Sequence, residues 1–425
     1  MIYRTRTILF LILLVLFLIA APLTVLYCLG WRFDWNTKSI IQPGVFYFKV
    51  WPKNAEVYLD AKLNKKTDLF FGSVLIENLK PKKYNVEIKK DGFHIWQKNL
   101  EIKKREVTEA KNIVLVPKEP KFNLLNKNVE DFFFSTDDKK IILKEGTEEG
   151  WALKLFEIDK NVKSHLISER DISKEKVEIF DLKFSPDSKI VLLELGFKEK
   201  IQYYLLEIDK TPPVLTSLGS LEKPEEFFSP SPLKKEAVAL TISGDDVYYL
   251  DDSGFLFKNE ARLNLIPHEI KKETKYEITA SGSNILLQED DILYIFDENT
   301  KSFQKLFQPI KSFKFSPDSQ KLVYANGHEI WVLFLEKKYD QPQREKGEKL
   351  FIARFSEELG NIFWYTNHYL IFKTNDKIKI AEIDDRDKIN IVDLAEFKSP
   401  EIFWANKKLY VLSEENLYVS EELTP

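Results

Sequence analysis

The chain starts with one long apolar segment and continues in short runs that alternate between apolar and polar positions. Residues 8–29 are apolar apart from Pro22 and Thr24. A helix of this length covers roughly 33 Å, which is enough for a hydrocarbon layer of ~30 Å. The pattern therefore predicts a transmembrane helix over 8–29, with residues 1–7 before it and a juxtamembrane segment, 30–42, after it.

Charges and aromatic side chains on either side of this segment predict its orientation. Arg4 and Arg6 precede the helix, and the positive-inside rule places such a terminus in the cytoplasm. Trp31, Phe33 and Trp35 follow it, as aromatic side chains do at a membrane interface. The expected location is therefore the cell membrane, with the C-terminal domains outside the cytoplasm.

Two other interpretations of the N-terminal apolar segment remain, a cleaved signal peptide and a lipidated N-terminus. A signal peptidase could cleave after Ala20-Ala21, although Pro22 would then follow the cut directly. Lipidation at Cys28 would need a small residue before it, and Tyr27 stands there. An uncleaved anchor is the favoured interpretation.

Residues 43–117 show period-two alternation, which is typical of strands with one buried face. The alternating runs lie at 45–50, 56–60, 84–88 and 112–116, and Pro, Asn, Asp and Gly separate them. This segment is predicted to be a small antiparallel β-sandwich.

Four ordered motifs in this segment resemble the PEGA domain family: Pro52-Lys53-Asn54-Ala55, Val57-Tyr58-Leu59-Asp60, Leu79-Lys80-Pro81-Lys82-Lys83-Tyr84 and Lys90-Asp91-Gly92-Phe93 followed by Trp96. The resemblance implies an extracytoplasmic spacer or adhesion module without catalytic activity. Asn54, Ala61 and Lys82 stand where the family has Gly, so these turns are expected to differ in shape.

Two features of this segment have both a functional and a structural interpretation. Trp96 could stack on a sugar, but packing in the sandwich core is favoured. The segment carries 15 basic and 9 acidic residues. This excess could hold it against anionic lipid or wall polymer, whereas a lysine-rich surface spread over all faces is the favoured interpretation.

Residues 118–425 contain a degenerate repeat. Its best copies are 181–188 and 311–319, which share Phe-Ser-Pro-Asp-Ser and run into an apolar strand. With five weaker copies, the anchor positions lie about 45 residues apart on average, as in a propeller with four strands per blade. The anchor positions are 134, 184, 228, 278, 315, 364 and 404.

The seventh copy stops after its third strand, near Val419. A strand near 121–125 is predicted to supply the fourth, closing a seven-bladed β-propeller and leaving no free sheet edge. The repeat resembles the WD40-like repeats of TolB-type propellers, although the Trp-Asp dipeptide is absent. This resemblance implies a protein-binding platform whose specificity lies in loops outside the repeat.

The composition favours no catalytic chemistry. One Cys and five scattered His, at 94, 165, 268, 328 and 368, argue against disulfide frameworks and zinc sites. The sequence contains no nucleophile elbow, Walker loop, GxGxxG or HExxH motif. Acidic pairs at 137–138, 251–252, 290–291 and 384–385 lack the spacing of a calcium loop and are interpreted as turn residues. The net charge of −4 argues against a nucleic-acid partner, because proteins that bind the phosphate backbone are generally basic.

The sequence as a whole predicts a mainly β, single-pass bacterial envelope protein that binds an envelope protein or a cell-wall polymer. No catalytic residue, cofactor or metal is expected, and no ligand-binding residue is assigned. Two alternatives remain: a structural component of a surface assembly, and a cryptic glycan hydrolase with a carboxylate pair in the propeller funnel.

Overall fold

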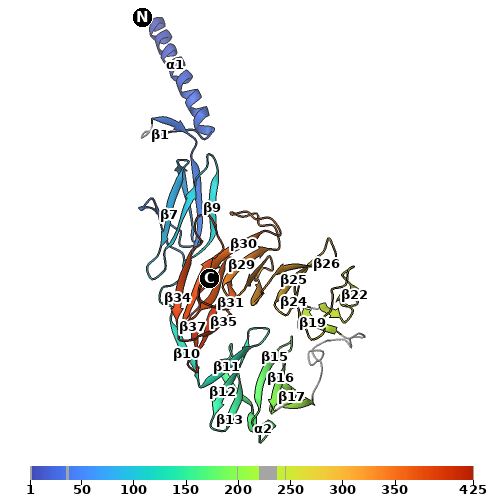
Figure 1. The fold of residues 1–425 in the computed structure, drawn as a ribbon. Coiled ribbons are helices and arrows are strands. Elements are labelled where there is room, and N and C mark those ends of the chain that lie inside the picture. Colours follow the sequence, from blue (N-terminus) through green and yellow to red (C-terminus); the bar gives the residue numbers. More distant parts are fainter. Residues whose placement is uncertain (1, 35–37, 199, 220–236, 245, 425) are drawn as a thin grey trace.

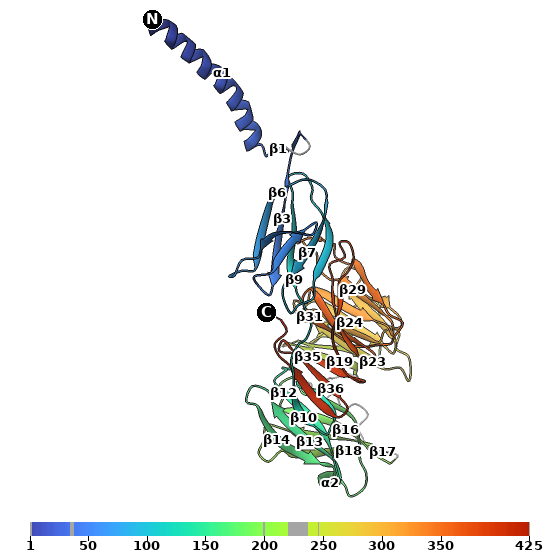
Figure 2. The same ribbon diagram turned by 90° about the vertical axis from the view of Figure 1, so that its left-hand side faces the viewer.

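The computed structural model describes residues 2–34, 38–198, 200–219, 237–244 and 246–424. The protein is mainly β, with one long helix at its N-terminus, a small two-sheet domain next to it and a larger group of sheets beyond (Figure 1). A quarter turn shows the three parts following one another, with the helix at one extremity (Figure 2).

Helix α1 (Ile2–Cys28) is exposed throughout its apolar stretch. Within Arg6–Cys28 an 18-residue window has a mean hydropathy of 3.1, and none of that window is buried. By length and composition it can cross a membrane, a property that it shares with signal sequences. The helix starts before the predicted residue 8, because no Pro or Gly interrupts the residues ahead of the apolar run. A short hairpin, β1 (Arg32–Asp34) and β2 (Ser39–Ile41), follows it.

Residues 44–114 form two sheets that enclose one hydrophobic core. The strand orders are β6-β3-β9 and β5-β4-β7-β8. Inward-facing residues of both sheets, such as Phe46, Phe48, Val57, Val86 and Ile88, are almost fully buried. The strands are β3 (Gly44–Trp51), β4 (Glu56–Leu59), β5 (Lys62–Lys66), β6 (Ser73–Leu79), β7 (Lys83–Lys89), β8 (Trp96–Glu101) and β9 (Val107–Val114).

The prediction of an antiparallel sandwich is wrong in one pairing. Strands β3 and β9 are parallel, with Val45 opposite Val107 and Trp51 opposite Val114. The chain leaves β8 and crosses to the other sheet at the end where β3 begins, so β9 runs in the same direction as β3. The period-two pattern reports which face is buried and carries no information on strand direction.

Two turns that lack the expected Gly keep a left-handed backbone. Asn54 has φ 59° and Ala61 has φ 63°. The turn shape is therefore retained at these positions at an energetic cost, which is greater for Ala61 because its side chain cannot hydrogen-bond locally.

In the described ranges after this domain, seven four-stranded antiparallel sheets follow, six of them built from consecutive strands. The consecutive sheets are β11 (Val129–Phe134), β12 (Lys140–Thr147), β13 (Gly150–Glu157), β14 (Val162–Ser168); β15 (Glu178–Phe184), β16 (Ile190–Phe197), β17 (Lys200–Glu207), β18 (Val214–Gly219); β19 (Ala237–Ser243), β20 (Asp246–Asp251), β21 (Leu256–Lys258), β22 (Ala261–Arg262); β23 (Tyr276–Ser281), β24 (Asn284–Glu289), β25 (Ile292–Asp297), β26 (Ser302–Phe307); β27 (Ser312–Phe315), β28 (Lys321–Ala325), β29 (Glu329–Phe334), β30 (Lys349–Arg354); and β31 (Leu359–Thr366), β32 (Tyr369–Thr374), β33 (Lys377–Glu382), β34 (Ile391–Glu396). A short helix, α2 (Glu169–Ile172), follows β14.

The remaining sheet combines strands that are far apart in the sequence. Its order is β10 (Phe122–Lys127), β37 (Asn416–Ser420), β36 (Lys408–Ser413) and β35 (Glu401–Ala405). Phe122 lies opposite Ser420 and Leu124 opposite Tyr418. The segment that the sequence assigns to the last sheet thus pairs with it.

Hydrophobic clusters join neighbouring sheets around most of this domain. In the part of the chain that the structure describes, each consecutive pair of sheets shares a buried cluster except the β15–β18 and β19–β22 sheets. The ring of apolar contacts is therefore open at this position. The predicted anchor at Phe228 lies outside the described residues. The apolar residues 237–240 that follow this anchor belong to β19, the first strand of its sheet, because Asp246–Asp251 takes the second place.

The Ser-Pro-Asp-Ser segments are turns held by one recurring hydrogen-bond network. Ser185 Oγ donates to Asp187 Oδ1 at 2.7 Å and accepts from the backbone N–H of Ile190 at 2.9 Å. Asp187 Oδ1 also accepts from the N–H of Lys189 at 3.2 Å. The same contacts recur at Ser316–Lys321 and in the degenerate copy Ser135–Lys140. The repeat therefore encodes the turn between the first two strands of a sheet.

Candidate functional site

The two-sheet domain is docked on the β31–β34 sheet through a buried lysine. Lys98, on β8, is fully buried, and its Nζ lies 2.7 Å from Glu382 Oε1. The same ammonium donates to the carbonyl oxygens of Asp384 at 2.7 Å and Lys388 at 2.6 Å. All three of its protons therefore have acceptors on the larger domain.

Glu382 is the counterpart of this lysine. Its carboxylate also accepts from Trp96 Nε1 at 2.8 Å, from the Asn390 N–H at 2.9 Å and from Asn390 Nδ2 at 2.7 Å. Burial raises the pKa of the carboxyl, and Lys98 with the N–H donors opposes that rise. A buried ion pair of this kind is costly to break, because the remaining charge would have no partner.

Trp96 packs in the sandwich core, as expected, and has a second role that the sequence did not indicate. It is 4% exposed within the core cluster, while its indole N–H reaches across to Glu382. Alternation along β8 places Trp96, Lys98 and Leu100 on one buried face. Lysine is rarely buried without a partner, so a lysine in the middle of an otherwise apolar strand face could have indicated an interface from the sequence.

Further hydrogen bonds surround this pair. The hydroxyl of Tyr369 accepts from the Val114 N–H at 3.0 Å. The side-chain amide of Gln341 forms two hydrogen bonds with β9. Its oxygen accepts from the Glu109 N–H and its nitrogen donates to the Val107 carbonyl, each at 3.0 Å. The contacts come from two strands of the small domain and from separate segments of the large one. They fix the orientation of the two domains relative to each other.

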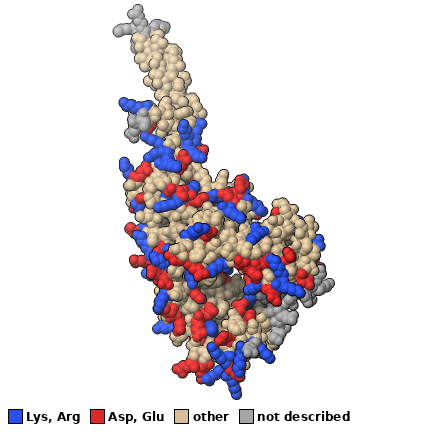
Figure 3. Space-filling model, in the orientation of Figure 1, with Lys and Arg blue, Asp and Glu red and all other residues tan. Residues whose placement is uncertain are grey.

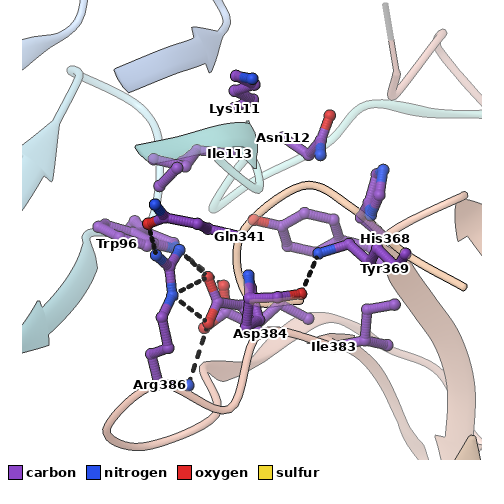
Figure 4. A pocket seen from close by; sticks show the side chains of 14 residues that line it. Trp96, Lys111, Asn112, Ile113, Gln341, His368, Tyr369, Ile383, Asp384 and Arg386 are labelled. Atoms are coloured by element: carbon purple, nitrogen blue, oxygen red, sulfur yellow. Dashed lines mark hydrogen bonds and ion pairs between the residues drawn. The ribbon is translucent and has the colours of Figure 1, made fainter. Parts of the chain in front are cut away.

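A cavity of about 40 Å³ lies inside this interface (Figure 4). Arg386 spans it, donating to the Asp384 carboxylate at 2.6 Å and to the Glu109 carbonyl at 2.7 Å. Burial lowers the pKa of His368 to about 4 and that of Lys338 to about 8. The cavity has room for a few water molecules and none for a substrate.

The larger cavity lies among the inner strands of the sheets that begin with β15, β19 and β23. Its volume is about 590 Å³, within the range of ligand pockets. Its lining combines apolar and polar residues: Thr136, Lys183, Phe184, Pro186, Leu240, Thr241, Ile242, Gly244, Tyr276, Glu277, Ile278 and Thr279. Glu277 is the one carboxylate among these described residues, and it pairs with Lys275 at 2.6 Å.

The histidines and the acidic pairs make separate contacts, although His368 and Asp384 line the same small cavity. His268 pairs with Glu289 at 2.9 Å, and His328 contacts the Glu357 carbonyl at 3.2 Å. Asp251, like Asp187, accepts backbone N–H groups of its own turn. Over the described ranges, no group of three or more His, Cys, Asp or Glu could hold a metal ion.

Comparisons with known proteins identify no family for this chain. No family model matches the sequence, and no curated protein matches it. Among solved structures, YCF48 from Cyanidioschyzon merolae is similar with a TM-score of 0.42 at 9% identity, over 70% of this chain and 98% of that one. BamB from Moraxella catarrhalis has a TM-score of 0.37 at 12% identity, over 68% and 84%. A complex of KlAtg21 with the coiled coil of AgAtg16 has 0.43 at 12% identity, over 70% and 95%. At these TM-scores the propeller-like architecture rests on the seven sheets themselves.

Proposed function

We propose that the protein is a single-pass, membrane-anchored binding or scaffold protein of the bacterial cell envelope. In this proposal a PEGA-like stalk holds a seven-bladed, TolB-type propeller outside the cytoplasm, and the protein acts without catalysis. The observation that carries the proposal is the buried Lys98–Glu382 interface. It makes one rigid body of the stalk and the sheets, so that the large domain is presented at a fixed position relative to the helix.

The larger cavity, among β15, β19 and β23, is the candidate ligand site. Its volume of about 590 Å³ and its mixture of Phe184, Tyr276, Lys183 and Thr279 suit a peptide segment or a short stretch of polymer. An envelope protein or a cell-wall polymer is the proposed partner.

The lining of this cavity supports a non-enzymatic role. Most glycoside hydrolases need two carboxyl groups across the scissile bond, about 5 to 10 Å apart. Among the described lining residues Glu277 is the one carboxylate, and it forms an ion pair with Lys275 at 2.6 Å. The hydrolase alternative therefore has no supporting observation.

Site-specific crosslinking in cells tests the proposal. A photo-crosslinking amino acid at Thr279, in the cavity, is compared with one at Lys174, on the exposed loop after α2. A heterologous partner captured from position 279 and not from 174 is the expected result. Capture of only a second copy of the chain would favour the structural alternative, and equal capture from both positions would refute the cavity as the site.

Thiol labelling tests the topology. The chain has one Cys, so replacing Cys28 by Ser gives a cysteine-free background. With Lys174→Cys in that background, a membrane-impermeant maleimide should label intact cells as fully as lysed ones. Labelling only after lysis would place the large domain in the cytoplasm and overturn the proposed location.

A further inference from the structure

The small domain is fastened directly to the end of the helix. Arg105, from the loop after β8, donates through Nη2 to the Leu29 carbonyl at 2.5 Å. Arg32 donates to the Tyr27 carbonyl at 2.7 Å and lies 3.7 Å from the centre of the Tyr27 ring. Tyr27 lies in the last turn of α1 and Leu29 directly after it, and the Tyr27 carbonyl also accepts from the Gly30 N–H at 3.1 Å. Cationic side chains are favourable at a helix C-terminus, where backbone carbonyls carry partial negative charge. The end of the domain that carries Arg105 therefore lies at the point where the helix leaves the membrane.

Three chain segments meet at that end. Gly44 lies opposite Leu79, which places residues 79–83 beside the start of β3. The Val45 N–H donates to the Glu106 carbonyl at 3.0 Å, and the Ile102 N–H donates to the Lys82 carbonyl at 2.9 Å. Segments 79–83 and 102–106 thus form one surface with the described hairpin residues 30–34 and 38–43, since Lys80 pairs with Asp34 and the Arg105 N–H donates to the Pro43 carbonyl at 3.2 Å.

This surface is strongly basic. The three segments contain eight basic residues and two acidic ones, Asp34 and Glu106. Basic side chains gather just below the uncharged helix in the space-filling view (Figure 3). We call the basic set the collar: Arg32, Lys38, Lys80, Lys82, Lys83, Lys103, Lys104 and Arg105.

Within the described chain, half of the collar has neither an ion pair nor a contact with a carbonyl at the helix end. Lys80 pairs with Asp34, and Lys82 with Asp60 at 2.6 Å, while the two arginines bind helix carbonyls. The other members are exposed, and no carboxylate of the described residues pairs with them: Lys38, Lys83, Lys103 and Lys104. Their charge is available to an external partner.

We propose that the collar binds the headgroups of anionic phospholipids. The inference rests on the proposed membrane anchoring and adds a second attachment to it. Electrostatic attraction to a charged membrane fades over about 8 Å at physiological ionic strength. The two arginine contacts hold the collar within that distance. Lipid is favoured over a wall polymer because the charge is on the helix end of the domain, where the membrane lies.

The consequence is a fixed orientation of the whole ectodomain. A helix alone leaves a domain free to tilt about its junction, whereas a second contact on the headgroups restricts that tilt. Through the buried Lys98 interface the restriction extends to the seven sheets.

Amine labelling of the full chain in nanodiscs tests the inference. Discs of phosphatidylcholine are compared with discs of equal parts phosphatidylcholine and phosphatidylglycerol, and acetylation at each lysine is followed by mass spectrometry. We expect Lys83, Lys103 and Lys104 to react about fivefold more slowly in the anionic discs, the effect of one headgroup contact per lysine. Lys174, beyond α2, should react equally in both, and high salt should remove the difference.

A charge-matched pair of variants separates a collar effect from a general charge effect. In Lys103→Glu/Lys104→Glu, Lys83 should lose its protection in anionic discs, whereas Lys174→Glu/Lys176→Glu should leave it unchanged. All four sites are exposed, so folding is expected to be retained, and hydrogen exchange of the core strands checks this.

The outcomes are distinguishable. Equal labelling of the collar in both kinds of disc overturns the inference while leaving the anchor intact. Protection that appears only when poly(glycerol phosphate) is added to phosphatidylcholine discs also overturns it, in favour of a polymer. A chain that does not co-elute with discs at all refutes the anchoring on which the proposed function depends.

Discussion

Removing the buried ammonium of Lys98 should loosen the docking of the two domains. In Lys98→Met the side-chain volume is nearly kept, but Glu382 stays at the interface with no cation, and two carbonyl groups lose their donor. Breaking a buried pair from one side costs about 3–5 kcal/mol. Since each 1.4 kcal/mol is a factor of ten, the docked state should become roughly 100- to 4,000-fold less favoured.

Hydrogen exchange at the interface measures this directly. The N–H of Asn99 donates to Asp387 Oδ2 at 2.9 Å, and that of Val114 donates to the Tyr369 hydroxyl. Both bonds exist only in the docked state, so peptides containing these amides should lose protection by that factor. Lys111→Met is the control, because the pair that it breaks with Asp340 is partly exposed and is worth at most about 1 kcal/mol.

The double variant and the pH dependence test the reasoning further. Lys98→Met/Glu382→Gln should lose less protection than Lys98→Met, because no buried charge remains. Burial raises the pKa of Glu382 above its ordinary 4.5 in the docked state, and losing Lys98 raises it more. In Lys98→Met the docked state holds the Glu382 proton more tightly than the undocked state does, so docking weakens as the pH rises from the ordinary pKa of 4.5 through the raised pKa. The cost of Lys98→Met should therefore be smaller at pH 5 than at pH 8. A loss below about 1 kcal/mol at neutral pH would refute the argument.

Three further changes test local features, each by the shift in unfolding midpoint. Ala61→Gly should stabilise the small domain by about 1 kcal/mol, because a φ of 63° is strained for Ala and free for Gly; no gain would mean that the turn relaxes. Asp187→Ala should destabilise by about 1–2 kcal/mol, since Ser185 Oγ and the Lys189 N–H lose their acceptor; an unchanged midpoint would show the turn network to be dispensable. Burial lowers the pKa of His368 to about 4 from 6.5, so between these values the unfolded state binds the extra proton and stability falls on acidification. His368→Asn should therefore gain stability relative to the parent as pH drops from 7 to 5, and parallel pH profiles would contradict this.

The sequence predicted the features that depend on local periodicity. Alternation marked β3, β4, β7 and the apolar strands of the repeat, and the charge-free run of 8–29 marked the helix. The Ser-Pro-Asp-Ser segments precede an apolar strand as the repeat indicated, and the side chain of Asp187 bonds within its own segment.

Features set by distant residues were not predicted. Strand direction in the β3–β9 pair depends on the crossover after β8, which leaves no trace in the pattern of buried positions. The partner of Lys98 is 284 residues away, at Glu382, so only the misplaced charge on a buried face could have signalled an interface. The larger cavity arises where sheets meet, and no single motif contains its lining.

The pairing of β10 with β37 means that the last sheet can be completed only at the end of translation. Phe122 leaves the ribosome almost 300 residues before its partner Ser420. Until then β10 is an unprotected strand edge, and closing so long a loop makes this pairing slow. The last sheet is therefore expected to form last, and the edge of β10 stays open to wrong pairing for the whole interval. A chain that ends before Asn416 would lack the partner strand altogether, so its β10 edge would stay exposed even after the other sheets have folded.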